Sequence, residues 1–388
     1  MTRPLLNRRL DGLGNSIFGV MSARAVATNS VNLGQGFPDV DGPSAIAKAA
    51  ADAVVAGKGN QYPPATGVPE LRNAVARHQQ RFYGLRYDPD TEVLITAGAT
   101  EAIAAALLAL LEPGDEVIAF EPYYDSYVAG IAMAGATRVP LTLRAPDFRP
   151  DLAELERKIT SKTRLLLLNS PHNPTGMVLT RAETEAIARI AIDHDLLVIT
   201  DEAYEHLTFD REHIPLATVD GMRGRVVSIG SAGKTFSFTG WKVGWATATP
   251  ELISAVLTTK QFLTFVSSGP FQYAVAQAFE LPDSYYTDMA AGLKAKRDLM
   301  AAGLAEIGFG VYRPDGTYFI TTDIAPLGER DAMEFCKGLP DRAGVVAIPS
   351  AVFYDDHPEA GRTMVRFAFC KRSEVLKEAL SRLSVLGR

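Results

Sequence analysis

The sequence predicts an α/β protein with a mainly parallel sheet, followed by a smaller α+β region. Three observations support this prediction. Short, unbroken apolar runs recur between residues 92 and 230 and alternate with stretches of helical periodicity, which is typical of parallel strands covered by helices on both faces. This alternation stops near residue 280. The length of 388 residues suits two or three domains.

Five apolar runs are expected to form the strands of the parallel sheet, because each is short and ends at glycine or polar residues. They are Glu92–Ala97, Glu116–Phe120, Arg164–Leu168, Leu196–Thr200 and Val226–Gly230. Helices are expected at Glu101–Leu111 and Arg181–His194. The first of these should stop at the Glu112-Pro113-Gly114 sequence.

A different pattern follows residue 280. A charged, alanine-rich segment predicts a helix over Ser284–Ile307, and Gly308–Ile324 has the pattern of a β-meander. Met364–Phe369 predicts a further strand. These elements indicate a second, smaller α+β domain.

Composition excludes several classes of protein. Hydrophobic residues make up 47% and charged residues 22% of the chain, which is ordinary for a globular protein and excludes a disordered one. The net charge of −6, without basic runs, is untypical of nucleic-acid or membrane-surface binding. Cys336 and Cys370 are the only cysteines and cannot form a disulfide framework or a C-x-x-C site.

The first residues lack the apolar core of a signal peptide. The longest apolar run, Ala102–Leu111, has ten residues, against about 20 for a membrane-spanning helix. We therefore expect a cytoplasmic protein with no membrane and no nucleic-acid partner.

The strands are followed by residues that could carry chemistry. Gly98-Ala99-Thr100 opens a helix after the first strand, Tyr124 follows the second, and Asn173 follows the third. Asp201 follows the fourth strand and Lys234 the fifth. Singly, these could be a tight turn, a core tyrosine or a helix cap. Because open parallel sheets bind ligands at the carboxyl ends of their strands, we expect the residues to share one site.

Two nucleotide-binding motifs are incomplete in this sequence, because each lacks a required glycine. Gly233-Lys234-Thr235 resembles the end of a P-loop, but Ser228 stands where the first glycine is needed. Gly12-Leu13-Gly14 has Ile17 in place of the third glycine of a dinucleotide fingerprint. A phosphate site, an aromatic ring, an amide, a carboxylate and a lysine instead match what pyridoxal phosphate requires. Lysine forms a Schiff base with its aldehyde, and a buried carboxylate keeps its pyridine nitrogen protonated.

The motifs also occur in the order of a known family. They are Asn173-Pro174-Thr175-Gly176, Asp201-Glu202-Ala203-Tyr204, Ser231-x-x-Lys234, Gly240-Trp241-Lys242-Val243-Gly244-Trp245 and Val365-Arg366-Phe367. In these motifs the chain resembles the class I, fold-type-I pyridoxal-phosphate aminotransferases, over most of its length from Val31 onward. It is most similar to the branch of kynurenine, glutamine and methionine aminotransferases, which includes actinobacterial N-succinyldiaminopimelate aminotransferases.

The resemblance implies a large domain with a mainly parallel seven-stranded sheet covered by helices, plus a smaller α+β domain. It implies that residues 1–44 form an N-terminal arm and part of the small domain. Residues 45–279 would form the large cofactor-binding domain and residues 280–388 the small C-terminal domain.

The resemblance also implies roles for the cofactor-site residues. Lys234 would hold the cofactor and then move a proton at the substrate Cα, while Asp201 would pair with the pyridine nitrogen. Tyr204 and Asn173 would face the phenolic oxygen, and Tyr124 would stack on the ring. The phosphate would be bound by Gly98, Ala99, Thr100, Ser231 and Lys242, with Tyr62 of a second subunit completing the site.

On the substrate side, Arg366 would bind the α-carboxylate as a bidentate fork and Gly36 would donate its backbone N–H. Asn173, Phe18 and Tyr62 would also contact the substrate. Arg24 is a candidate for a second carboxylate, although a surface role is the plainer interpretation. Trp241 and Trp245 are expected to be packing residues. The histidines have no metal-ligand spacing; His172 lies in the asparagine motif, and the others are expected at the surface or at caps (His78, His194, His206, His213, His357).

The implied activity is ping-pong transfer of an amino group to an oxo acid, with 2-oxoglutarate as acceptor, by a homodimer with shared sites. N-succinyl-LL-2,6-diaminopimelate, kynurenine, glutamine and methionine are candidate donors. A large, apolar side-chain pocket is expected from Ile17-Phe18-Gly19, Tyr62, Tyr124 and the partner's Phe262–Ser268. Three alternatives stay open: a β-lyase acting on cysteine S-conjugates, a non-catalytic binding or regulatory protein with the same fold, and an unrelated α/β enzyme.

Overall fold

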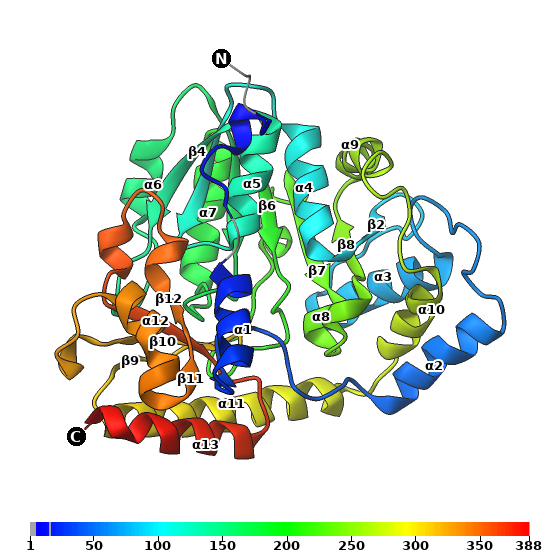
Figure 1. Cartoon of the computed structure of the whole chain (residues 1–388). Helices are drawn as coiled ribbons and strands as arrows, with labels where there is room; N and C mark the ends of the chain where they lie inside the picture. The colour runs from blue at the N-terminus through cyan, green and yellow to red at the C-terminus, as the bar shows by residue number, and fades with distance from the viewer. Residues whose placement is uncertain (1–4, 15–16, 388) are drawn as a thin grey trace.

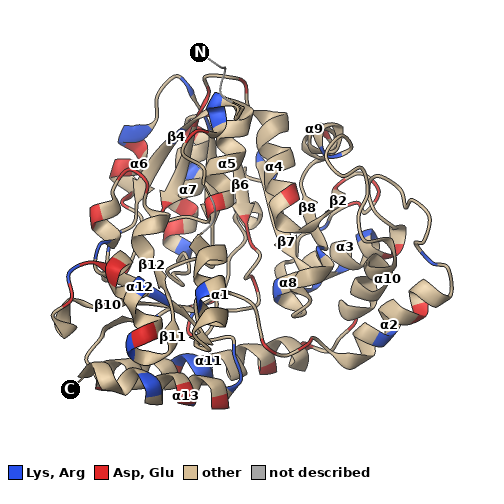
Figure 2. Ribbon diagram, in the orientation of Figure 1, with Lys and Arg blue, Asp and Glu red and all other residues tan. Residues whose placement is uncertain are grey.

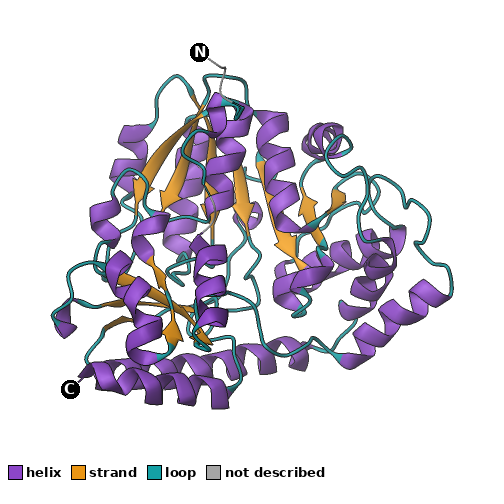
Figure 3. Cartoon of the chain, in the orientation of Figure 1, coloured by secondary structure: helices purple, strands orange, loops and turns teal. Residues whose placement is uncertain are grey.

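Seven strands form the central sheet in the computed structural model, which describes residues 5–14 and 17–387 (Figures 1 and 3). Their order across the sheet is β2 (Val93–Thr96), β8 (Gly244–Thr247), β7 (Val226–Ser231), β6 (Leu197–Asp201), β5 (Thr163–Asn169), β3 (Glu116–Glu121) and β4 (Thr137–Thr142). Only β8 runs against its neighbours; the others point the same way. The predicted mainly parallel sheet is confirmed.

All five predicted strands are present, with ends shifted by at most one residue. Strands β4 and β8 were not predicted from the sequence. Strand β4 is an edge strand whose first residues are partly exposed and which contains Pro140, so it lacks an apolar run and tolerates a proline that a central strand would not. Strand β8 begins at Gly244 and ends at Thr247, so it also lacks an unbroken apolar run.

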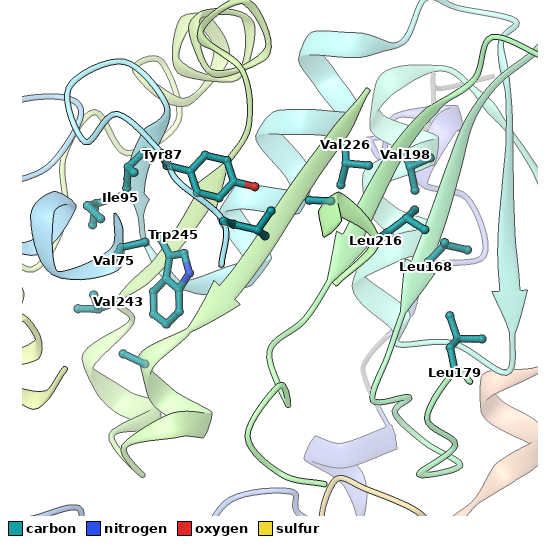
Figure 4. Packing of buried hydrophobic residues seen from close by; sticks show 14 of the residues in the cluster. Val75, Tyr87, Ile95, Leu168, Leu179, Val198, Leu216, Val226, Val243 and Trp245 are labelled. Carbon is teal, nitrogen blue, oxygen red and sulfur yellow. The ribbon is translucent and has the colours of Figure 1, made fainter. Parts of the chain in front are cut away.

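Helices cover both faces of this sheet. On one face α4 (Gly98–Leu110), α5 (Asp125–Ala134) and α9 (Pro250–Lys260) pack over alternate strand residues such as Leu165 and Leu167. The other face carries α2 (Ser44–Val55), α3 (Pro69–Tyr83), α6 (Leu152–Lys158), α7 (Arg181–Asp193) and α10 (Gly269–Ala278). There the intervening residues Leu166 and Leu168 join the core that contains Val198, Val226 and Trp245 (Figure 4). This explains the continuous apolar runs, since both faces are buried.

The C-terminal part builds a second core. A four-stranded antiparallel sheet has the order β12 (Ile348–Pro349), β13 (Met364–Ala368), β10 (Phe319–Asp323) and β9 (Gly310–Tyr312). Beside it, β1 (Val31–Asn32) pairs in parallel with β11 (Val345–Val346). The surrounding helices are α1 (Ile17–Ala27), α11 (Asp283–Ile307), α12 (Ala332–Ala343) and α13 (Ser373–Leu383). The domain boundaries at residues 44 and 279 stay a prediction.

Charged residues of both signs are interspersed along the outer helices α6, α11 and α13 (Figure 2). Within the described residues, none of the helices combines the length and the apolar character needed to cross a membrane.

Candidate functional site

The carboxyl ends of the central strands surround a cavity of about 300 Å³. Most of the predicted site residues line it: Phe18, Gly36, Gly98, Ala99, Thr100, Tyr124, Asn173, Asp201, Tyr204, Ser231, Lys234, Lys242 and Arg366. The antiparallel strand β8 also contributes to this edge of the sheet. Because β8 is antiparallel, its start lies at the same edge as the ends of the others, and this brings Lys242 to the cavity.

The start of α4 forms an anion-binding corner. Glu101 accepts the backbone N–H of Ala97, but within the described residues no N-cap side chain bonds to this helix start, so backbone N–H groups at Gly98, Ala99 and Thr100 are available to an anion. Lys242 Nζ lies 3.3 Å from the point that a Cβ on Gly98 would occupy. A Cβ on Gly244 would come within 2.5 Å of the Gly98 carbonyl carbon, so glycine is required there to let the two segments meet.

Asp201, at the end of β6, is a buried carboxylate held in one orientation. Tyr127 donates its hydroxyl to Oδ2 at 2.6 Å, and the backbone N–H of Ala203 donates to Oδ1 at 3.1 Å. Burial raises the pKa of Asp201, while these two hydrogen bonds and the nearby Lys234 act in the opposite direction. The site therefore holds a fixed acceptor for a cationic or N–H group.

Lys234 lies in the short helix α8 (Ala232–Thr235), and its side chain reaches into the cavity. Nζ is 3.4 Å from the carbonyl oxygen of Gly36 and 5.7 Å from the centre of the Tyr204 ring. Burial lowers the pKa of Lys234 to about 8, with a smaller raising effect from Asp201. The lowered pKa makes the uncharged amine, which a nucleophile or general base requires, more accessible near neutral pH than in a free lysine.

Arg366 is buried in β13, where it faces the cavity. One terminal nitrogen donates to Asn173 Oδ1 and the other to the Gly34 carbonyl, each at 3.0 Å. Its Nε has no partner within the described part of the chain. Arginine has five N–H groups, so donors remain for a planar anion such as a carboxylate.

The backbone near Gly36 closes this side of the cavity. A Cβ on Gly36 would lie 2.4 Å from the Phe319 ring, so a larger residue would displace that ring. The Tyr318 hydroxyl donates to the Gly36 carbonyl at 2.5 Å.

Tyr62 stands apart from the other predicted site residues. It does not line the cavity of its own chain, and 83% of its surface is exposed. Its ring meets that of Phe265 edge-on at 5.7 Å, and Phe262, three residues earlier in the chain than Phe265, is 82% exposed. Its contribution to a partner's site stays a prediction.

Arg24 forms an ion pair with Asp341 at the surface and is absent from the cavity lining. Both tryptophans pack as expected. Trp245 lies in the core of the large sheet, and the Trp241 ring stacks between those of Phe238 and Phe271, at 3.8 and 4.7 Å.

The expectation for the histidines was partly wrong. His78 and His213 are buried, and His206 packs against the rings of Phe82 and Tyr286. His78, Glu205 and His206, here called the histidine cluster, offer ligand atoms within 4.8 Å of one another. Sequence spacing could not reveal this group, because His78 comes from α3 and meets the other two only in the folded chain. His172 is buried and contacts Thr175 at 2.7 Å.

Several residues at the site were not predicted from the sequence. Tyr127 contacts Asp201, Tyr318 and Phe319 enclose Gly36, and Gln35 lines the cavity. Only Tyr127 had a usable signal: it lies one helical turn after Tyr124, so both can face the same side.

Comparison with known proteins identifies the family. Residues 28–383 match the family model described as aminotransferase class I and II. The chain is 51% identical to the Mycobacterium tuberculosis protein named "Probable N-succinyldiaminopimelate aminotransferase DapC", with 98% of each chain covered. It is 38% identical to the methionine aminotransferase of Escherichia coli, with 97% of each covered. Identity to mouse kynurenine–oxoglutarate transaminase 3 is 36%, over 96% of this chain and 88% of the relative.

Solved structures agree. The N-succinyldiaminopimelate aminotransferase of M. tuberculosis superposes with a TM-score of 0.95 at 51% identity, covering 98% of this chain and 100% of the other. The E. coli methionine aminotransferase gives 0.93 at 38% identity, with the same coverage. The chain therefore belongs to the class I and II aminotransferases, in the branch of the methionine, kynurenine and N-succinyldiaminopimelate enzymes, and is a pyridoxal-phosphate-dependent aminotransferase.

Proposed function

We propose that this enzyme moves the α-amino group of an amino acid to 2-oxoglutarate by a ping-pong reaction at the cavity described above. The observation that carries the proposal is the convergence of three groups of different chemistry. An amine with lowered pKa (Lys234), a buried carboxylate (Asp201) and an arginine with spare donors (Arg366) line one cavity.

The residues present fit pyridoxal phosphate. The uncapped start of α4, with Lys242 beside it, suits the phosphate. Asp201 would accept the pyridine N–H, and Tyr124 would cover one ring face. The Oδ1 of Asn173 already accepts from Arg366, which leaves the amide nitrogen, together with the Tyr204 hydroxyl, to donate to the phenolic oxygen. Ser231 would be a further phosphate ligand.

When bound, the cofactor supplies an aldehyde that receives the amino group and a ring that draws electrons from the substrate Cα. The protein supplies the rest. Lys234 would take the proton from the substrate Cα and deliver it to the cofactor carbon that receives the amino group. Arg366, Gly36 and Asn173 hold the substrate carboxylate, which orients the Cα proton toward Lys234.

We infer a homodimer with shared sites. Tyr62, Phe262, Leu263 and Phe265 are all exposed, and the rings of Tyr62 and Phe265 are in contact; a partner subunit would cover such apolar side chains. In the dimer, Tyr62 would complete the partner's phosphate and substrate sites. Both cysteines are free and buried, which suits the reducing cytoplasm that we propose as the location.

The donor proposed first is a large neutral amino acid: methionine, kynurenine or glutamine. Phe18, Tyr124 and Ile103 provide apolar lining, and the cations on the described lining are Lys234, Lys242 and Arg366, each of which already has a proposed role. The second candidate is N-succinyl-LL-2,6-diaminopimelate, which the 51% identity to the M. tuberculosis protein favours. Its distal carboxylate would need a receptor beyond these three, such as one from the partner subunit.

The visible absorption spectrum of the purified holoenzyme tests the proposal. Each candidate donor is added singly without an oxo acid, and we expect the cofactor's yellow band to bleach and to recover after addition of 2-oxoglutarate. The rank of bleaching rates identifies the donor. A band that none of the amino acids bleaches would contradict the proposed function.

A further inference from the structure

A buried carboxylate connects the central sheet to a loop of the C-terminal part. Glu121 is the last residue of β3 and is fully buried. One of its oxygens accepts the backbone N–H groups of Asp355 and Asp356, at 2.7 and 3.0 Å. The other accepts the hydroxyl of Thr142 at 3.1 Å. A carboxylate that receives two backbone N–H groups holds a loop more firmly than neutral hydrogen bonds do.

Further contacts tie the same loop, residues 353–356, to the sheet edge. The backbone N–H of Tyr123 donates to the Phe353 carbonyl at 3.1 Å, and its hydroxyl donates to Asp355 at 2.9 Å. The Tyr354 hydroxyl donates to the Leu143 carbonyl, also at 3.1 Å. Arg138 forms ion pairs with Asp355 and Asp356. Of these groups, only Glu121 is a fully buried charge, so its loss would leave two loop N–H groups without an acceptor.

The loop matters because its first residue packs on the arginine of the site. The Phe353 ring centre is 4.9 Å from the guanidinium carbon of Arg366, and the rings of Phe319 and Phe18 lie at 4.0 and 5.1 Å. Phe353 is 3% exposed and also contacts Phe18, at 5.9 Å between ring centres. Three rings around a guanidinium stabilise its charge and exclude water from it. They also fix the plane in which a carboxylate can be bound by two N–H groups.

We propose that Glu121 is a positioning residue for substrate carboxylate binding, acting by holding residues 353–356 so that the Phe353 ring keeps the Arg366 guanidinium in place. The inference rests on the proposed function of Arg366. Glu121 also begins the turn that leads to Tyr124. The same turn therefore connects Tyr124, which lines the cavity, with Glu121, which holds the loop of residues 353–356.

The test compares two probes on the holoenzyme: methionine, and the amine left when methionine loses its carboxyl group, 3-(methylthio)propylamine. Glu121→Leu removes both acceptor oxygens at similar volume. We expect KM for methionine to rise about 10-fold with kcat changed less than about threefold, because binding is lost equally in ground and transition states. The slow reaction with the amine should not change, since it does not use Arg366.

Three further variants make the result specific. Glu121→Gln keeps one acceptor oxygen and should restore a KM close to that of the wild type. Phe353→Leu should raise KM like Glu121→Leu, and the double variant should show no additional rise if both act through the same ring. Glu183→Leu is the matched control, because Glu183 is also a hydrogen-bonded carboxylate but caps α7 and pairs with Arg149 away from the cavity. It should leave KM unchanged.

Equal losses with methionine and with the amine would overturn the proposal, as would additive effects of the two substitutions. If Glu121→Leu does not fold, Glu121→Asp replaces it, since it keeps the charge but withdraws the carboxylate by one methylene from the loop. The same KM increase is then expected, and an unchanged KM would contradict the proposal. A wild-type band that methionine and the other amino acids fail to bleach would instead contradict the proposed function.

Discussion

The cavity and the histidine cluster take residues from the same short segment of chain, and both contain buried titratable groups. Tyr204 lines the cavity, whereas the next residue, Glu205, belongs to the cluster. Burial shifts pKa values in both regions: it lowers that of Lys234 to about 8 and raises that of Glu205 to about 8. The shifts alone therefore do not distinguish a reactive site from a structural one.

The surroundings make the difference. In the cavity, Lys234 and Asp201 influence each other as opposite charges and face open volume. In the cluster, Nε2 of His78 and Nε2 of His206 form a 2.7 Å hydrogen bond among aromatic rings. Two imidazole nitrogens bound to one tetrahedral zinc would be about 3.3 Å apart, so this spacing is that of a hydrogen-bonded pair. We expect the cavity to govern activity and the cluster to govern stability.

The largest effect should come from Lys234→Ala. Loss of the amine removes both the attachment group and the proton carrier, so the rate of cofactor bleaching by the donor should fall at least about 10³-fold. The variant should remain folded, because the histidine cluster and the core are unchanged. Lys48→Ala, at an exposed lysine of α2, controls for loss of a positive charge. Near-normal turnover would refute the role of Lys234.

Arg366→Lys should have the next largest effect. A lysine keeps the charge but cannot form the two parallel hydrogen bonds of a guanidinium, so KM for the donor should rise about 100-fold. Saturation curves of the half-reaction measure this change. Arg297→Lys is the matched control, because Arg297 is a buried arginine that pairs with Asp210 outside the cavity. It should reduce stability without a change in KM, and equal KM values for both variants would contradict the assignment.

Tyr127→Phe should have a moderate effect. It removes the hydroxyl that donates to Asp201, and since this hydrogen bond holds the pKa of Asp201 down, its loss should raise that pKa further. The acid limb of the pH–rate profile should move to higher pH, and the rate should fall about 10-fold. Tyr286→Phe removes a hydroxyl that packs near the histidine cluster and should leave the profile unchanged. A shift in both variants would mean that the two regions are coupled.

Glu205→Gln should have the smallest effect on activity, because we expect no change outside experimental error. Its effect on stability should be measurable. The pKa of Glu205 is about 8 in the folded protein against 4.5 for the free side chain. The unfolded chain therefore releases this proton first, and wild-type stability should fall as pH rises from 4.5 to 8. The amide does not titrate, so the Tm of the variant should fall less over this range than the Tm of the wild type. We expect the two falls to differ by about 2 °C or more. Parallel Tm curves for both proteins would contradict this account.

Much of the site could be predicted because its residues follow the strands of a parallel sheet. Alternating apolar runs located β2, β3, β5, β6 and β7, and the polar residues just beyond them converge at one edge. Lys242 was found only through the family motif, because the antiparallel strand β8 that follows it (Gly244–Thr247) has no unbroken apolar run.

The sequence by itself determined the fold class, the family and the set of chemical groups, since periodicity and local motifs depend on neighbours along the chain. Tertiary structure alone decided which distant residues support those groups. Glu121 meets Asp355 and Asp356, Tyr127 meets Asp201, and His78 meets His206 across separations that leave no periodic trace. The physical reason is burial: it shifts pKa values and requires hydrogen-bond partners, and both depend on what packs nearby after folding.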